Sequence, residues 1–319
     1  MVRVLDDLEL RVVAALQVDP RAPWRKIAAV LREPERTVGR RGNELIDARL
    51  VNIVGVRLRA ESALLRLQCA PGTARVTAES IAQRQDSTFS YIMTGGADCV
   101  AELLFDHGDM RNVLTTEVPA TVGLVRALSY PILRYFRTIR RWTSEAITPQ
   151  QIAALTTDLT PETSGMVPDD VLTGVDLRIA NVLAEDGRAN LETIARRAAT
   201  SETTAGRRLD WMLANSRVQI RALVEPATLG LPVEAMLWIK AAPHRVESLG
   251  RSLATHRQVR YAVAVAGAHN VVANVTFATN AELYDFITTS DWAQEAESIE
   301  STVLLHARKR GGRLNHLAF

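Results

Sequence analysis

Residues 9–54 read ELRVVAALQVDPRAPWRKIAAVLREPERTVGRRGNELIDARLVNIV, and residues 176–221 read DLRIANVLAEDGRANLETIARRAATSETTAGRRLDWMLANSRVQIR. The two stretches align without a gap at an offset of 167 residues, and 15 of their 46 positions are identical. Thr37-x-Gly39-Arg40-Arg41 recurs as Thr204-x-Gly206-Arg207-Arg208. An ungapped match of this length indicates an internal repeat, which decides how the rest of the chain is read.

A weaker similarity continues at an offset of 172, where Gly95-x-x-Asp98 overlies Gly267-x-x-Asn270 and Phe105 overlies Phe277. Each half therefore contains a first module of about 55 residues and a second of about 80. Between the halves lies a stretch rich in Thr and Pro, which is typical of a linker and has a short helix near residues 150–155. The predicted segments are residues 1–60 (helical), 61–142 (α+β), 143–172 (linker), 173–226 (helical), 227–310 (α+β) and 311–319 (tail).

The composition is that of a globular protein with real cores, because 47% of the 319 residues are hydrophobic and 23% are charged. No segment has the pattern of a signal peptide, and no apolar run approaches the ~18 residues needed to span a bilayer. The two cysteines, Cys69 and Cys99, lie in apolar strand-like stretches and are interpreted as packing residues rather than a disulfide framework. We expect a cytoplasmic protein with no membrane partner.

Positive charge is concentrated in two separate blocks. Residues 20–60 contain ten Arg/Lys and four Asp/Glu, and residues 187–226 contain seven and four. Such blocks attract a polyanion, although a solvated helical surface explains the same excess.

The first module of each half reads as three short helices. Apolar residues recur every three or four positions over residues 10–16 and 177–183, a second helix follows from Trp24 or Leu191, and Ser201 is a good N-cap for the third. In the third helices Val38, Gly42 and Leu45, and likewise Ala205, Leu209 and Met212, have the spacing of an inward face.

This spacing leaves a polar outer face on each third helix, as in the helix-turn-helix of DNA-binding proteins. Arg contacts guanine edges and phosphates, while Thr and Asn contact phosphates or bases. The predicted DNA-binding residues are Arg36, Thr37, Arg40, Arg41, Asn43, Thr203, Thr204, Arg207 and Arg208. Short strands follow at residues 50–53 and 218–221, and we interpret them as the wing of a winged helix-turn-helix.

The second module has the order β-α-β-β-α-β in both halves. Strands are predicted at residues 64–69, 89–93, 100–105 and 124–128, and again at 234–240, 259–266, 271–277 and 301–307. In the second half, helices are predicted from Pro243 and from Asn280, with Asn280 as the cap. The fold class is α+β, with two ferredoxin-like sandwiches whose open sheet faces need a cover, and the second copy is the obvious one.

A helix-turn-helix followed by this β-α-β-β-α-β module resembles the Lrp/AsnC family of leucine-responsive, or feast/famine, regulators. Asp186-Gly187-Arg188 and Ser201-Glu202-Thr203-Thr204 fit the family's pattern well, and Asp19-Pro20-Arg21 fits it less well. The family's Thr-Gly-x-x-Asp turn between the second and third strands matches Thr94-Gly95-Gly96-Ala97-Asp98. Ala266 to Asn270 keeps the Gly and lacks the Thr and Asp.

The resemblance implies a sequence-specific, nucleoid-associated regulator of double-stranded DNA whose second modules (RAM domains) pair sheet to sheet. Within one chain this gives a pseudo-dimer, with further association into homo-dimers or higher oligomers. It also implies a small effector, such as an amino acid, near the turns. The predicted effector-binding residues are Thr94, Gly95, Asp98, Gly267 and Asn270. A tight hairpin turn favours Gly and Asp on its own account.

Two other functions stay open. Some relatives with the same two-domain unit are sirohaem decarboxylases with His, Tyr and Arg around this hairpin, whereas residues 89–92 and 260–263 here offer no such set, and His269 is interpreted as a surface residue. Alternatively, the chain senses an effector through helix-turn-helix modules that have decayed, as the interior glycines Gly39 and Gly42 suggest. No catalytic, metal-binding or cofactor motif is recognised, so we expect neither an enzyme nor a cofactor.

Overall fold

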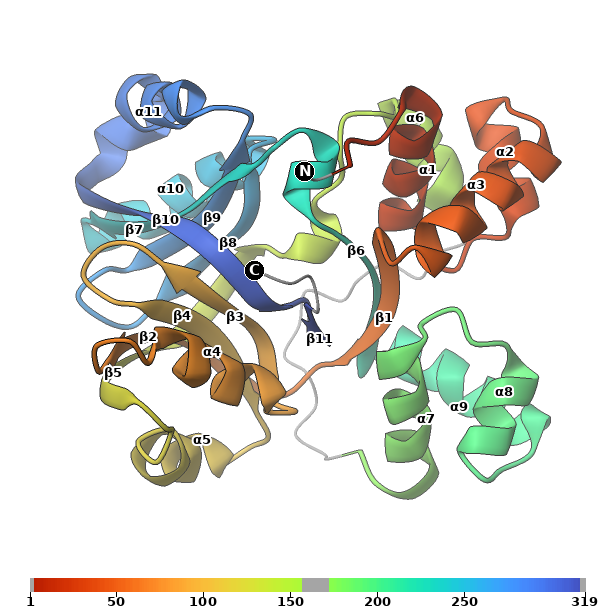
Figure 1. Cartoon of the computed structure of the whole chain (residues 1–319), viewed down its shortest axis with the longest axis horizontal. Helices are drawn as coiled ribbons and strands as arrows, with labels where there is room; N and C mark the ends of the chain where they lie inside the picture. Colours follow the sequence, from red (N-terminus) through yellow and green to blue (C-terminus); the bar gives the residue numbers. More distant parts are fainter. Residues whose placement is uncertain (1–2, 157–171, 316–319) are drawn as a thin grey trace. The chain divides into compact units, whose positions relative to one another are not determined.

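The computed structural model describes residues 3–156 and 172–315. The chain forms two compact units, and each combines segments from both halves of the sequence (Figure 1). Unit 1 is Met1–Ala60 with Thr143–Leu229, and unit 2 is Glu61–Trp142 with Gly230–Phe319. The boundaries of the six predicted segments stay predictions.

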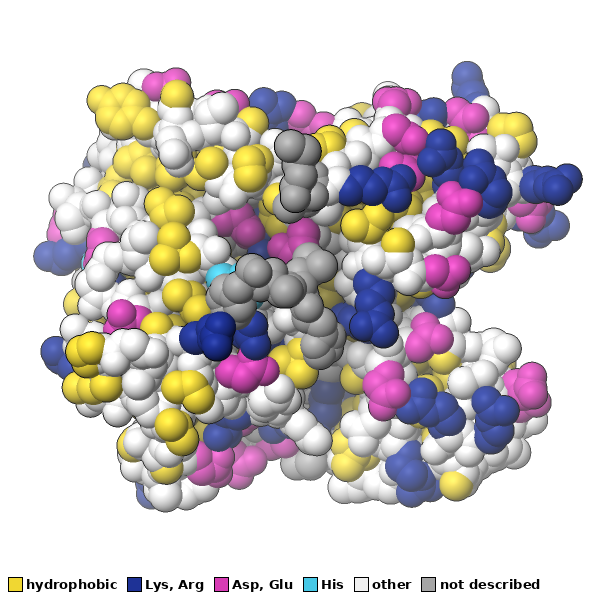
Figure 2. Space-filling model, viewed as in Figure 1, with side chains coloured by type: hydrophobic (Ala, Val, Ile, Leu, Met, Phe, Trp, Pro, Cys, Tyr) yellow, Lys and Arg dark blue, Asp and Glu magenta, His cyan; other side chains and the backbone are white. Residues whose placement is uncertain are grey.

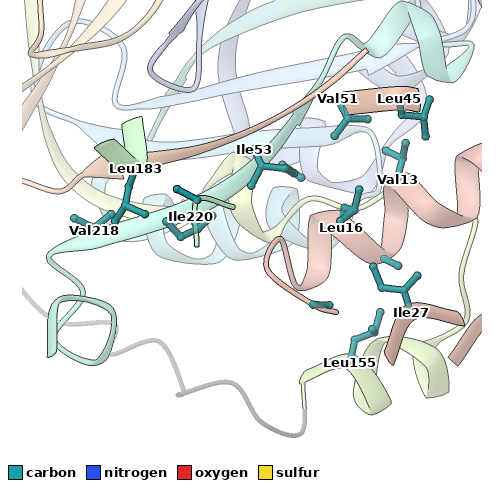
Figure 3. Packing of buried hydrophobic residues seen from close by; sticks show 14 of the residues in the cluster. Val13, Leu16, Ile27, Leu45, Val51, Ile53, Leu155, Leu183, Val218 and Ile220 are labelled. Atoms are coloured by element: carbon teal, nitrogen blue, oxygen red, sulfur yellow. The ribbon is translucent and has the colours of Figure 1, made fainter. Parts of the chain in front are cut away.

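Unit 1 contains two sets of three helices in the predicted places. The first set is α1 (Asp7–Val18), α2 (Trp24–Leu31) and α3 (Glu35–Asp47); the second is α7 (Gly174–Glu185), α8 (Leu191–Arg197) and α9 (Glu202–Ala214). The predicted inward residues of both third helices are buried. Each set therefore buries one apolar stripe per helix in a small core, and both belong to one continuous cluster (Figure 3).

The strand after each set pairs with the other strand. β1 (Val51–Arg57) and β6 (Val218–Val224) form an antiparallel two-stranded sheet in which Val54 lies opposite Arg221, its own counterpart in the repeat. The prediction of a wing was wrong in this respect, because neither strand turns back on its own copy. The pairing instead joins the two three-helix sets, with equivalent positions of the repeat lying opposite each other.

Two arginines reinforce this junction in reciprocal fashion. The Arg21 guanidinium donates to the carbonyl oxygens of Gly187 and Ala189 at 2.5 and 3.1 Å, and the Arg188 guanidinium donates to those of Pro20 and Ala22 at 2.8 and 3.1 Å. Burial lowers the pKa of both arginines. The fork of each guanidinium thus replaces water at backbone groups of the opposite copy.

The predicted linker helix is α6 (Pro149–Thr156), and it packs on the first copy. Figure 3 shows Leu155 of α6 beside Ile27 of α2, and the Lys26 Nζ donates to the Leu155 carbonyl at 2.8 Å. The second copy has Thr193 where α2 has Lys26, so it lacks the donor that binds α6, and it has a charged Arg197 in place of Val30. Residues 157–171 of the predicted linker lie outside the described residues.

Unit 2 contains two β-α-β-β-α-β modules, which the prediction anticipated. The first has β2 (Glu61–Cys69), α4 (Ala74–Gln83), β3 (Ser87–Met93), β4 (Cys99–Phe105), α5 (Asp109–Asn112, continued by a π-helix) and β5 (Leu124–Arg137). The second has β7 (Val233–Ala241), α10 (Val246–Thr255), β8 (Val259–Val265), β9 (Val271–Phe277), α11 (Asn280–Thr289) and β10 (Ala296–Arg310), with a short β11 (Arg313–Leu314). The sheet orders β3-β4-β2-β5 and β8-β9-β7-β10 are those of ferredoxin-like modules.

The two sheets share their long last strands. β5 pairs with β2 over its first part and with β8 over its second, and β10 pairs likewise with β7 and then with β3. Within the described residues of unit 2, the eight long strands thus close into a ring, so neither sheet has a free edge. The inner faces of both halves meet in one core that includes Leu64, Tyr91, Trp238 and Val263.

Two buried carboxylates of unit 2 are satisfied by hydrogen bonds. The Glu102 carboxylate is 5% exposed and accepts hydrogen bonds from the hydroxyls of Thr88, Tyr135 and Tyr261. The Glu234 carboxylate accepts from the guanidinium groups of Arg260 and Arg310, which hold its pKa below the usual range although burial acts in the opposite direction.

Two details of the prediction need correction. The last strands are longer than predicted, because β5 continues through Pro131 from one sheet into the other and β10 passes in the same way from β7 to β3. The cap of α11 is Thr279 rather than Asn280, since the Thr279 hydroxyl accepts from the Glu282 N–H at 3.2 Å.

The reciprocal arginines should control the local stability of the junction in unit 1. Because a hydrogen bond from a charged donor contributes about 1.5–3 kcal/mol and Arg188 makes two, we expect Arg188→Ala to lower the local opening free energy of β1 and β6 by roughly 3–6 kcal/mol. Arg188→Lys should not restore it, since an ammonium has no fixed fork for two carbonyls. Amide hydrogen exchange measures this, with the β8–β9 amides as the internal control. Unchanged β1 and β6 exchange in the Ala variant would contradict the role.

Candidate nucleic-acid interface and effector turns

The turn before each third helix contains a left-handed residue at the same place. Arg32 and Ala199 occupy equivalent positions and are both left-handed, with φ of 58° and 51°. The predicted cap of α9 is confirmed, because the Ser201 Oγ accepts from the Thr204 N–H at 3.2 Å. In the first copy Pro34 stands at this position and offers no side-chain cap.

Gly42, one of the two interior glycines of α3, has a packing reason. A Cβ on Gly42 would lie 2.3 Å from the Trp24 ring, and the Arg188 guanidinium lies over the same ring at 4.5 Å from its centroid. The second copy has Leu191 and Leu209 at the positions of Trp24 and Gly42. The first copy thus fills this space with one large side chain on α2 and none on α3, where the second copy uses two leucines. This explains Gly42 without decay of the module.

The predicted outer faces are on the surface. Arg36, Arg40 and Asn43 of α3 are exposed, as are Thr203 and Arg207 of α9. Figure 2 shows Lys and Arg side chains gathered over the α1–α3 segment, interspersed with acidic ones. The Arg40–Glu44 ion pair at 2.7 Å is exposed on both sides. Such a pair contributes little, so Arg40 stays available to another anion.

Arg41 and Arg208 instead face the first helix of their own copy. The Arg41 guanidinium lies 3.0 Å from the Asp6 carboxylate and 3.1 Å from that of Glu9. The Arg208 Nε lies 2.6 Å from an Asp176 oxygen, and this hydrogen bond raises the pKa of Arg208. Glu9 and Asp176 are equivalent in the repeat, so these contacts tie each third helix to the first. Thr37 and Thr204 are half-buried, and the Thr204 Oγ1 is hydrogen-bonded to Ser201.

The side chains in the predicted effector turns serve the turns themselves. The Asp98 carboxylate accepts from the Cys69 N–H at 2.7 Å. At the equivalent place, the Asn270 Oδ1 accepts from the Ala241 N–H at 2.9 Å and its Nδ2 donates to the Ala241 carbonyl. Each side chain therefore fixes the β3–β4 or β8–β9 turn to the end of the neighbouring strand.

The difference between the two turns has a backbone cause. The Thr94 Oγ1 accepts from the Val303 N–H at 3.0 Å, whereas the equivalent of Val303 is Pro131, which has no N–H, and the equivalent of Thr94 is Ala266. The hydroxyl is present only where a donor needs it.

Glycine is required in both turns by close approach. A Cβ on Gly95 would lie 2.9 Å from the Thr302 side chain, and one on Gly267 would lie 2.4 Å from the Tyr130 ring. Thr302 and Tyr130 are equivalent residues of β10 and β5, so each half's turn packs on the last strand of the other half.

A charged cluster next to the first turn was not predicted. The Arg66 guanidinium is bound by both oxygens of Glu300, at 2.9 and 2.6 Å, and stacks on Trp238 at 4.6 Å. The His269 Nε2 lies 3.7 Å from Glu300. His269 is half-buried, so its interpretation as a surface residue was wrong. These residues are far apart in sequence, and only the pairing of β10 with the first half brings them together.

The electrostatics of this cluster favour the charged carboxylate. Hydrogen bonds from Arg66 lower the pKa of Glu300. Burial lowers the pKa of His269, while the Glu300 carboxylate acts in the opposite direction. A wholly ionised Arg66–Glu300 pair beside a neutral imidazole is the arrangement at neutral pH.

Comparisons with known proteins agree with the geometry of both units. Residues 172–213 match the AsnC-type helix-turn-helix domain, and residues 234–314 match the Lrp/AsnC ligand-binding domain. An uncharacterised HTH-type transcriptional regulator of Pyrococcus furiosus is 30% identical over 145 residues, which span 97% of that protein and 44% of this chain. The chain belongs to the Lrp/AsnC family. It is a transcription regulator of this type, with a helix-turn-helix and a ligand-binding domain.

Solved structures of this family cover about the same share of the chain. The leucine response regulatory protein LrpA of Mycobacterium tuberculosis is 25% identical, with a TM-score of 0.39, over 42% of this chain and 93% of its own. The sirohaem decarboxylase NirDL covers 98% of this chain and 95% of its own, with a TM-score of 0.59 and 14% identity. This second likeness concerns the fold of the whole chain alone. No helix in the described ranges is long and apolar enough to cross a bilayer.

The Trp24–Gly42 contact predicts a compensating pair of substitutions. Overpacking a core costs typically ~1–3 kcal/mol, so Gly42→Leu alone should lower the free energy of unfolding of the first copy by about that amount. Trp24→Leu together with Gly42→Leu recreates the pair Leu191–Leu209 and should recover most of the loss. Urea unfolding measures both variants. If the double variant loses as much free energy of unfolding as Gly42→Leu and Trp24→Leu lose separately, added together, this packing account is contradicted.

The Asp98 contact predicts that an amide can replace the carboxylate. Asp98→Ala leaves the Cys69 N–H without its acceptor and should lower the free energy of unfolding by about 1–3 kcal/mol. Asp98→Asn should lose far less, because Asn270 makes the equivalent contact. Urea unfolding of unit 2 checks both, and equal losses would show that the turn depends on the negative charge instead.

Proposed function

We propose that this chain binds duplex DNA in a sequence-specific manner through both recognition helices at once. The observation that carries the proposal is the β1–β6 pairing, which holds two exposed, arginine-bearing third helices in a single unit. DNA-binding helix-turn-helix proteins place two such helices in successive major grooves as dimers. Here one polypeptide supplies both, and a tandem duplication of the Lrp/AsnC unit is the proposed origin.

The residues proposed to meet DNA are those that the fold leaves exposed. Arg36, Arg40 and Asn43 on α3, with Thr203 and Arg207 on α9, have no burial to overcome before they reach a groove. Arg41, Arg208, Thr37 and Thr204 are proposed to support the position of the helices.

We also propose that a small effector, such as an amino acid, binds at the turns near Thr94, Gly95, Asp98, Gly267 and Asn270. Exposed Gly95 and Gly96 leave backbone groups accessible, and the Arg66–Glu300 pair supplies both charges beside them. The two unequal turns imply two unequal sites in an intramolecular pseudo-dimer. A cytoplasmic, nucleoid-associated protein that assembles into larger oligomers fits this function.

The DNA proposal predicts a loss of affinity when one exposed arginine is removed from each recognition helix. Because an arginine contact to a base contributes ~1–3 kcal/mol, the loss of two such contacts in Arg40→Ala with Arg207→Ala should weaken binding roughly 30-fold or more. If both arginines contact phosphate, the slope of log Kd against log[KCl] should fall by about two, at ~0.9 per phosphate. Fluorescence anisotropy on a duplex selected from a random pool measures both quantities.

The matched control for this experiment lies in unit 2. Arg134 and Arg251 are exposed and both pair with Glu247, so Arg134→Ala with Arg251→Ala removes the same charge from a surface outside the recognition helices. This control should bind like the unaltered chain. Equal effects of the two double variants would reduce the interaction to overall charge and contradict recognition through α3 and α9.

A second candidate function is favoured by the likeness of the whole fold to a sirohaem decarboxylase and by His269 beside Arg66. Against it, Arg66 is already neutralised by Glu300 through two hydrogen bonds. An absorbance titration with sirohaem separates the candidates: tight binding with a spectral shift to product would replace the regulator proposal, and an unperturbed spectrum supports it.

A further inference from the structure

The two helix-turn-helix copies have the same backbone and different charge, and we infer from this that they hold duplex DNA unequally. The first copy anchors the phosphate backbone through Arg25, Arg32 and Arg36, and the second makes fewer phosphate contacts. The site on DNA is therefore asymmetric. This inference rests on the proposed function and specifies how the two copies share the DNA.

The three arginines lie along the segment of a helix-turn-helix that contacts DNA. Arg25 is in the first turn of α2, Arg32 is in the connecting turn, and Arg36 is in the first turn of α3. In this motif the first residues of the recognition helix meet base edges while the preceding helix crosses the backbone. All three side chains are exposed, and none has an ion pair or hydrogen bond within residues 3–156 and 172–315.

Two of these arginines are placed against local helix preference. The first turn of a helix favours acidic side chains and disfavours cations by typically ~0.3–1 kcal/mol. Arg25 and Arg36 nevertheless stand there, and the first turn of α2 contains no acidic residue to offset Arg25. A phosphate bound between the two helix starts would supply the missing negative charge.

The second copy has lost this charge at the same positions. Arg25, Arg32, Arg36 and Asn43 correspond to Glu192, Ala199, Thr203 and Asp210, so four exposed sites change from a net charge of +3 to −2. Phosphate repels Glu192 and Asp210. The second copy has two cations on this helix that the first copy lacks, Arg196 and Arg197, in place of Ala29 and Val30. Both lie in the last turn of α8, where the helix itself favours them, and Arg197 is paired with Glu185 at 2.6 Å.

The difference is chemical rather than conformational. The connecting turns share their left-handed residue, and both third helices bury the same stripe of positions. The AsnC-type match covers residues 172–213, which is the less basic copy. The second copy thus matches the family model, whereas the first copy has the greater positive charge.

Salt-dependent binding to a 40-base-pair duplex of mixed sequence tests the inference with the full chain. One variant is Arg25→Ala with Arg32→Ala and Arg36→Ala. The other removes the two unpaired exposed arginines of the second copy, Arg196→Ala with Arg207→Ala. All five residues are on the surface, so circular dichroism and thermal unfolding should match the unaltered chain.

We expect the triple variant to reduce the slope of log Kd against log[KCl] by about 2.7, at ~0.9 per phosphate, and to weaken binding roughly tenfold or more. The double variant should reduce the slope by about one. Conversely, Glu192→Arg with Ala199→Arg and Thr203→Arg should tighten binding and raise the slope.

The possible failures are distinguishable. If the unaltered chain binds the duplex and the double variant of the second copy loses as much affinity as the triple variant of the first, or more, the inferred asymmetry is wrong. The proposal that the chain binds DNA would still stand. If the unaltered chain does not bind duplex DNA at low salt, or no variant has an effect, the proposed function itself fails.

Discussion

The antiparallel pairing of β1 with β6 is the constraint on which unit 1 depends. Seven residue pairs join two three-helix sets that would otherwise be separate, and the reciprocal Arg21 and Arg188 forks close the junction on both sides. Because the strands satisfy each other's backbone groups, neither copy can withdraw without exposing unpaired N–H and C=O groups. In unit 2 the long strands β5 and β10 have the same effect, since each completes a sheet of the other half.

Strand pairing fixes the backbone of both halves alike, and side chains that contact each other differ between the halves as pairs. Trp24 with Gly42 replaces Leu191 with Leu209, and Thr94 with Val303 replaces Ala266 with Pro131. In each case one partner changes volume or hydrogen-bonding capacity and the other changes to suit. Arg25, Arg32 and Arg36 lack such a partner within the described residues, which is why they point to something outside the chain.

Much of the fold could be predicted because it follows from local periodicity and from the repeat. The helices from Trp24 and from Glu202, and the Ser201 cap, follow from spacing and capping alone. The partner of β1 could not be predicted, because a wing and a ribbon have the same strand pattern. Arg41 and Arg208 belong to the same Arg-Arg dipeptides as Arg40 and Arg207, and only the fold shows which member faces the first helix. The Arg66–Glu300–His269 cluster depends on strand exchange, which leaves no local signal, whereas a comparison of charges between the two copies would have found Arg25 and Arg32.

Hydroxyl-radical footprinting of the bound chain on a duplex selected from a random pool tests the central claim most directly, namely that two joined and unequal helix-turn-helix copies act on DNA together. The account predicts two protected clusters on one face of the duplex, separated by a whole number of helical turns of ~10 base pairs, with one cluster protected more strongly. A single protected cluster, or two whose spacing varies from site to site, would contradict it, because the β1–β6 ribbon permits only one separation of the recognition helices.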